Sequence, residues 1–144
     1  MSNITDTMSA DHHRCDDIFS EAEALISKGD WEQGGPKYKE FQEAMEKHFA
    51  MEEEVLFPTF EQRTGQTMGP TQVMRMEHSQ MRQLFAEMAE SVEQRDQEKY
   101  LGQSETLLMV MQQHNAKEEQ ILYHMADQVL SGEVSEVLER MEAV

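Results

Sequence analysis

Two short segments of the chain place a histidine and a glutamate four residues apart. They are His48-x-x-x-Glu52 and His114-x-x-x-Glu118. On a helix, residues i and i+4 lie on the same face, one turn apart. Imidazole nitrogens and carboxylate oxygens together suit iron, manganese or zinc, whereas calcium and magnesium prefer mainly oxygen. Each segment therefore has the residue types and the spacing of one half of a metal-binding site.

These segments belong to a longer internal repeat. The second follows the first by 66 positions, from 48 to 114, and the same offset relates Asp11-His12 to Glu77-His78. Self-similarity of this kind indicates a repeated structural unit. We therefore predict two helical hairpins of one design. Four of the six histidines have a repeat partner, and the two that do not, at positions 13 and 124, are expected to lie outside the site.

Apolar residues recur at spacings of three and four, which predicts helices. The expected helices run from an N-cap at Ser9 to Lys28, from Gly34-Gly35-Pro36 to Pro58, from about Thr71 to Val92, from Tyr100 to Met125, and over about 133–142. Pro58 should kink or end the second helix, because proline lacks a backbone N–H. Short links make neighbouring helices antiparallel.

The predicted fold class is therefore all-α. We expect an antiparallel up-down-up-down four-helix bundle with a short C-terminal fifth helix, built from two similar helical hairpins. At 144 residues, the chain is expected to form a single domain over 1–144, with its core bundle over about 9–130.

The composition limits the partners of the chain. Its net charge is −17 at pH 7, whereas a nucleic-acid-binding protein needs a basic surface. It contains no run of about 18 apolar residues, so no membrane-spanning helix is expected. The single cysteine, Cys15, cannot form an intrachain disulfide, and Met1 to Ala10 do not have the pattern of a secretory signal. These features favour a cytoplasmic protein.

Six candidate metal ligands fall on the apolar faces of the predicted helices. They are His12, His48, Glu52, His78, His114 and Glu118. One histidine on an apolar face is more often a satisfied core residue than a ligand. A buried glutamate, however, is costly unless it is paired or binds a metal. Two glutamates can bridge two metal ions, which leaves two histidines for each ion.

The acidic-His and His-x-x-x-Glu motifs resemble those of the hemerythrin-like family, the His-His-Glu cation-binding domain. The resemblance covers Asp11 to about Gln128. It implies a four-helix bundle with a non-heme di-iron centre, in which the two glutamates and an oxo or hydroxo group bridge the two iron ions. It also implies an open iron position for dioxygen or nitric oxide. Ferritin-like bundles use Glu-x-x-His instead, and the residues three before His48 and His114 are methionines.

The ligand set differs from that of the oxygen-carrying family members. Those proteins have a second histidine four residues after the third-helix histidine, where this chain has Arg82. The four-His, two-Glu set is more similar to that of di-iron proteins for repair of iron centres. Asp16 is the repeat counterpart of Arg82, and the two side chains are expected either to pair and orient the ligands or to be solvated. Glu53 and Glu119 are expected to be solvated.

The leading hypothesis is a cytoplasmic non-heme di-iron protein that binds or reacts with dioxygen or nitric oxide. Its task would be oxidative or nitrosative stress response, sensing or iron-centre repair. One alternative is a reversible oxygen carrier or store, and another is a metal-stabilised interaction bundle without redox function. The expected partners are the diatomic ligand and an unidentified redox protein, with neither nucleic acid nor membrane. The residues leave open whether the chain is an enzyme.

Overall fold

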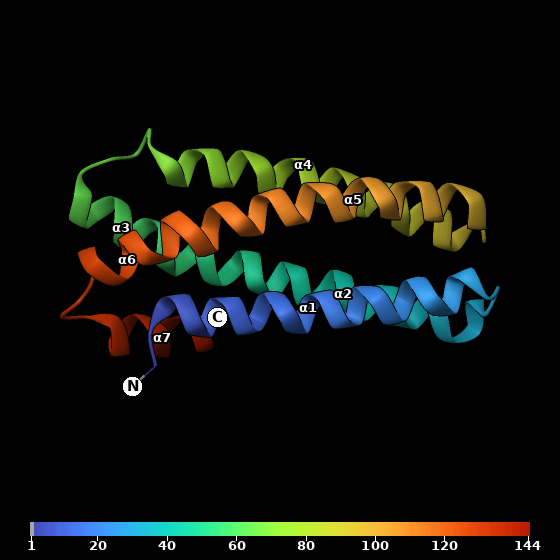
Figure 1. Cartoon of the computed structure of the whole chain (residues 1–144), viewed down its shortest axis with the longest axis horizontal. Coiled ribbons are helices and arrows are strands. Elements are labelled where there is room, and N and C mark those ends of the chain that lie inside the picture. The colour runs from blue at the N-terminus through green and yellow to red at the C-terminus, as the bar shows by residue number, and fades with distance from the viewer. Residues whose placement is uncertain (1) are drawn as a thin grey trace.

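Four long helices pair into two hairpins in the computed structural model, which describes residues 2–144 (Figure 1). The first hairpin is α1 (Ile4–Ser27) with α2 (Trp31–Met51), and the second is α4 (Pro70–Glu93) with α5 (Gln97–Lys117). Helix α2 also contacts α4, and α1 contacts α5, which closes the bundle. A short helix, α7 (Val134–Glu142), packs against one end. The predicted all-α four-helix bundle with a short C-terminal helix is confirmed.

The first two helices begin earlier than the sequence predicted. Helix α1 is capped by Asn3, whose side chain accepts a hydrogen bond from the Asp6 N–H, so the expected cap at Ser9 is wrong. Helix α2 is capped by Asp30, so it begins before the glycines that were expected to start it. Gly34 fits where α2 meets α1, because a Cβ there would lie 2.8 Å from Ile26 Cγ1.

Each hairpin contains a π-helical turn that begins at a candidate glutamate. These turns are Glu52–Leu56 and Glu118–Leu122, and they continue into α3 (Phe57–Thr64) and α6 (Tyr123–Val129). The helix therefore does not end at Pro58, as was thought possible from the sequence. Proline is not the general cause of the π turn, because His124 occupies the matching position in the second half. Single π turns occur frequently at functional sites.

Polar side chains divide the apolar core into two clusters. One cluster lies toward the two hairpin turns and includes Phe19, Phe41 and Phe85. The other lies toward α3, α6 and α7 and includes Leu56 and Leu122. The six candidate ligands belong to neither cluster and lie along the chain between residues of the two. Within residues 2–144, no helix has the length and apolar character needed to cross a lipid bilayer.

Candidate metal centre

The structure brings all six candidate ligands together in the polar layer. They come from α1 (His12), α2 (His48), the first π turn (Glu52), α4 (His78), α5 (His114) and the second π turn (Glu118). None of these side chains is more than 3% exposed. Because the hairpins repeat, residues 66 positions apart in the sequence take equivalent places on opposite sides of the bundle axis.

The Nε2 atoms of the four imidazoles face the two glutamates. In the first hairpin, His12 Nε2 lies 3.0 Å from Glu118 Oε1, and His48 Nε2 lies 3.5 Å from Glu52 Oε1. In the second, His78 Nε2 lies 3.1 Å from Glu52 Oε1, and His114 Nε2 lies 3.2 Å from Glu118 Oε1. Both glutamates therefore stand between the two histidine pairs, where a bridging carboxylate would be needed.

The outward-facing Nδ1 atom of each histidine contacts a carboxylate on a neighbouring helix. The distances are 2.7 Å from His12 to Glu119, 2.7 Å from His48 to Asp11, 2.6 Å from His78 to Glu53, and 2.8 Å from His114 to Glu77. In a neutral imidazole, an Nδ1–H donated outward leaves the Nε2 lone pair directed into the site. This is how metal-binding histidines are usually oriented.

The outer carboxylates were only partly visible in the sequence. Asp11 and Glu77 belong to the acidic-His motifs, but each contacts a histidine on another helix and not its own neighbour in the sequence. The expectation that Glu53 and Glu119 are solvated is wrong, because each contacts an imidazole. Their signal was their own position one residue after each candidate glutamate, at the same 66-residue offset.

Asp16 and Arg82 do not pair with each other. Arg82 forms ion pairs with Glu53 and Glu46, and it thereby supports the carboxylate that contacts His78. Asp16 lies near Glu119, whose charge raises the pKa of Asp16 in addition to the larger effect of burial. The two matched positions therefore act on two different outer carboxylates, with opposite charge.

The metal-free site binds protons tightly. Burial disfavours the imidazolium form, but the charge of Glu52 and the hydrogen bond to Asp11 raise the pKa of His48 to about 10. Against the same effect of burial, Glu118 raises the pKa of His114 to about 9. Burial also raises the pKa of Glu52, and the neighbouring charge of Glu118 adds to this shift. A cation that replaces these protons would neutralise the same carboxylates.

Four buried atoms of the second histidine pair and the glutamates make no hydrogen bond of acceptable geometry with the described residues, although His78 Nε2 and Glu52 Oε1 lie only 3.1 Å apart. They are Glu52 Oε1, His78 Nε2, His114 Nε2 and Glu118 Oε2. One ligand atom from each of these four residues lies within 4.8 Å of the others, and His12, His48 and Glu118 form a second such group. Unpaired buried polar atoms are costly. Converging nitrogen and oxygen donors of this kind fit a transition-metal ion.

The family comparison agrees with this geometry. The model of the hemerythrin HHE cation-binding domain matches residues 3–126. The chain belongs to this family. The sequence-based recognition of a hemerythrin-like domain is thereby confirmed, and with it metal binding as the general function. No curated protein and no solved structure matches the chain.

Tyr123 is the residue of the centre that sequence reasoning missed. It is fully buried, and its hydroxyl oxygen lies 2.8 Å from Glu52 Oε2 and 2.9 Å from Glu118 Oε1. The sequence contained a signal for it, since the two repeats differ at this position, with Phe57 in the first. His13 and His124 are exposed, and neither takes part in the groups that could hold a metal.

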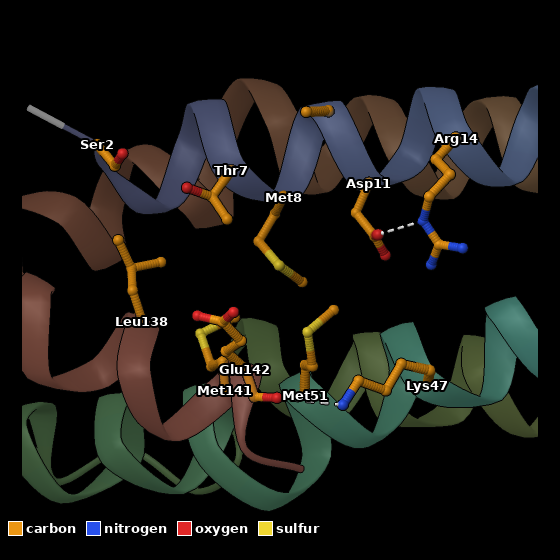
Figure 2. Close-up of a pocket in the computed structure, with 11 residues that line it drawn as sticks. Ser2, Thr7, Met8, Asp11, Arg14, Lys47, Met51, Leu138, Met141 and Glu142 are labelled. Atoms are coloured by element: carbon orange, nitrogen blue, oxygen red, sulfur yellow. Dashed lines mark hydrogen bonds and ion pairs between the residues drawn. The ribbon is translucent and has the colours of Figure 1, made fainter.

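A pocket of about 500 Å³ opens beside the centre, between α1, α2 and α7. Figure 2 shows Met8, Met51 and Met141 along it, with Asp11 and Arg14 at one end. Asp11 uses one oxygen to accept a hydrogen bond from Arg14 and the other to contact His48. The pocket therefore reaches the outer layer of the centre.

Proposed function

We propose that this chain is a non-heme di-iron protein that binds or reacts with dioxygen or nitric oxide. The two irons would be held by His12, His48, Glu52, His78, His114 and Glu118. One observation carries the proposal: buried Nε2 and carboxylate atoms converge without protein hydrogen-bond partners around the second histidine pair. Iron suits mixed imidazole and carboxylate ligands, and when bound it supplies an open position for a diatomic ligand and a change of oxidation state.

The protein residues would orient the ligands and keep the centre dry. Outer carboxylates such as Asp11 and Glu77 hold each Nδ1–H, so that the inward Nε2 stays free to coordinate. The apolar clusters on both sides of the polar layer restrict the entry of water. Reversible oxygen storage is less well supported, because Arg82 pairs with Glu46 and Glu53 at the place where oxygen-carrying members have a fifth histidine.

The methionine-lined pocket is the approach that we propose for the diatomic ligand. The methionine side chains on its wall suit a neutral molecule, and Met51 is one turn from His48. Met51→Trp should fill the pocket and slow nitric oxide binding. Met109→Trp is the matched control, because Met109 is 62% exposed on α5. Equal association rates in both variants would exclude this route.

The biological setting that we propose is stress response, sensing or iron-centre repair in the cytoplasm. Diatomic binding at a redox-active metal links all three tasks. The free, buried thiol of Cys15 is compatible with a reducing compartment. A redox partner protein would be needed if the centre turns over.

Metal analysis of anaerobically reconstituted protein tests the proposal most directly. We expect two iron ions per chain and a change in the iron absorption spectrum on adding nitric oxide. The double variant His13→Ala/His124→Ala is the control and should bind as much iron as the parent. One iron or fewer in the parent would contradict the dinuclear centre. Two irons that leave nitric oxide and dioxygen unbound would contradict the diatomic function alone.

A further inference from the structure

The two halves of the centre differ in one aromatic side chain. Phe57 begins α3 in the first half, and Tyr123 begins α6 in the second, 66 positions later. The ring of Phe57 stacks near His78 with centroids 5.7 Å apart, and the ring of Tyr123 lies 5.7 Å from His12. The rings therefore take equivalent places beside opposite histidine pairs, and only one of them carries an oxygen.

The Tyr123 hydroxyl lies among the inward atoms of the first histidine pair. Besides its contacts with both glutamates, its oxygen is 3.3 Å from His12 Nε2 and 3.4 Å from His48 Nε2. These two nitrogens and the two contacted carboxylate oxygens surround it. A side-chain oxygen so placed, in a wholly buried site, is a potential donor to any cation held by the same atoms.

The second histidine pair has a different environment. Its four inward atoms, two from His78 and His114 and two from the glutamates, lack hydrogen-bond partners among residues 2–144. The matching ring there is Phe57, which has no donor atom. The two glutamates each direct one oxygen toward Tyr123 and the other toward the unpaired group.

We propose that Tyr123 is an additional oxygen ligand to the metal ion held by His12 and His48, and that the two metal positions are therefore inequivalent. The proposal rests on the dinuclear function proposed above. Coordination breaks the phenol O–H bond and forms an oxygen–metal bond, and the proton leaves to solvent with no change of oxidation state. A phenolate is a hard, anionic donor, which suits ferric iron.

Absorption spectroscopy of the ferric protein tests this inference. A tyrosine bound to ferric iron gives a visible charge-transfer band, with tyrosine ring modes enhanced in the Raman spectrum excited within that band. We expect the band and these modes in the parent protein. Tyr123→Phe, which copies the first half of the chain, should lose them entirely.

Two further variants sharpen the test. Tyr100→Phe is the matched control, because Tyr100 is equally buried, lies in the cluster near the hairpin turns, and makes no hydrogen bond through its hydroxyl within the described chain. It should keep the band. In the Tyr123→Phe background, Phe57→Tyr moves the phenol to the second pair and should restore a band.

The outcomes separate this inference from the proposed function. A parent protein with two ferric ions and no tyrosine signature would overturn the role of Tyr123 and leave the dinuclear centre standing. A band that survives in Tyr123→Phe would overturn it equally. A parent that binds fewer than two ions would overturn both. Loss of the signature in Tyr123→Phe but not in Tyr100→Phe would establish the ligand.

Discussion

The first and second hairpins carry the same set of candidate ligands in different surroundings. His12 and His48 repeat as His78 and His114, and all four use Nδ1 to contact an outer carboxylate. The difference lies in what touches the inward atoms. The Tyr123 hydroxyl forms a hydrogen bond with Glu52 Oε2 near the first pair. The Nε2 atoms of the second pair make no hydrogen bond within residues 2–144. The repeat thus builds two similar half-sites, and one aromatic side chain distinguishes them.

The outer layers of the two halves also differ. Arg14 pairs with Asp11 and Lys117 with Glu77, so these equivalent carboxylates both contact a cation. The other two equivalent carboxylates, Glu53 and Glu119, have neighbours of opposite charge. Arg82 supports Glu53, whereas Asp16 places a second acid near Glu119. The His12 side of the centre is therefore more negative than the His78 side, which would favour a more highly charged cation at the proposed metal position there.

Removing a histidine from either pair should have the largest effect. We expect His78→Ala and His12→Ala each to lower the iron content from two ions to one, because each pair would lose half of its imidazole ligands. The remaining ion should differ between them: it keeps the tyrosine signature in His78→Ala and lacks it in His12→Ala. Elemental analysis with absorption spectroscopy measures both. Identical spectra in the two variants would show that the halves are equivalent.

Replacing a shared glutamate tests whether the halves depend on each other. Burial and the charge of Glu118 raise the pKa of Glu52, so its charge destabilises the metal-free fold at neutral pH. We expect Glu52→Gln to stabilise the metal-free protein by about 1 kcal/mol, or roughly 2–4 °C in Tm, and to abolish binding of two ions. Thermal melts and iron analysis decide this. A metal-free variant that melts below the parent would mean that the carboxylate is not crowded.

The bundle and the convergence of the six candidate ligands could both be predicted from the sequence. Both follow from spacing: the donors at positions i and i+4 must share a helix face, and the 66-residue offset makes the hairpins equivalent. The outer carboxylates depend on which helices are neighbours and how they are rotated, which spacing within one helix does not determine. The acidic-His motif therefore included Asp11, but the sequence did not predict that Asp11 would contact His48.

Other features required the backbone itself. The π turns at Glu52 and Glu118 have similar sequences, Glu-Glu-Glu-Val-Leu and Glu-Glu-Gln-Ile-Leu, but these residue types fit an α-helix equally well. The early start of α1 is stabilised by Ile4 and Met8, which continue its buried stripe on the N-terminal side of the cap expected at Ser9. The sequence shows that Tyr123 differs from its repeat counterpart, Phe57. Only the structure shows that the Tyr123 hydroxyl lies among four donor atoms.

The pH dependence should have the same sign in both halves. His48 and His114 have pKa values of about 10 and about 9 in the metal-free fold, against an ordinary value of 6.5. Their contribution to the stability of the metal-free protein is full below pH 6.5 and is lost as the pH rises through 9 to 10. Metal must displace these protons, so apparent metal affinity should rise over the same interval.

The difference in Tm between the metal-bound and metal-free protein should therefore widen between pH 6.5 and pH 9. We expect the widening to be roughly 5 °C or more, the effect of about 2 kcal/mol in a chain of this size. Differential scanning calorimetry at several pH values measures it. A difference that is constant with pH would mean that these imidazoles are neutral before metal binds.

The smallest expected effect concerns Arg82, whose counterpart in the first half is Asp16. Arg82 is about one-third exposed and acts on His78 only through Glu53, so its ion pair should contribute up to about 1 kcal/mol. Arg82→Ala should keep both irons but change the rate of reaction with nitric oxide by less than about fivefold, the factor that corresponds to this energy. It should act at the His78 side, because Glu53 would then hold the Nδ1–H without support. Asp16→Ala should remove a negative charge near Glu119 and affect the His12 side instead, visible as a shift of the tyrosine band. Stopped-flow kinetics and absorption spectra of the two variants, measured side by side, separate these effects. If Arg82→Ala shifts the tyrosine band and Asp16→Ala alters the nitric oxide rate, the assignment of the two outer charges to their half-sites is reversed.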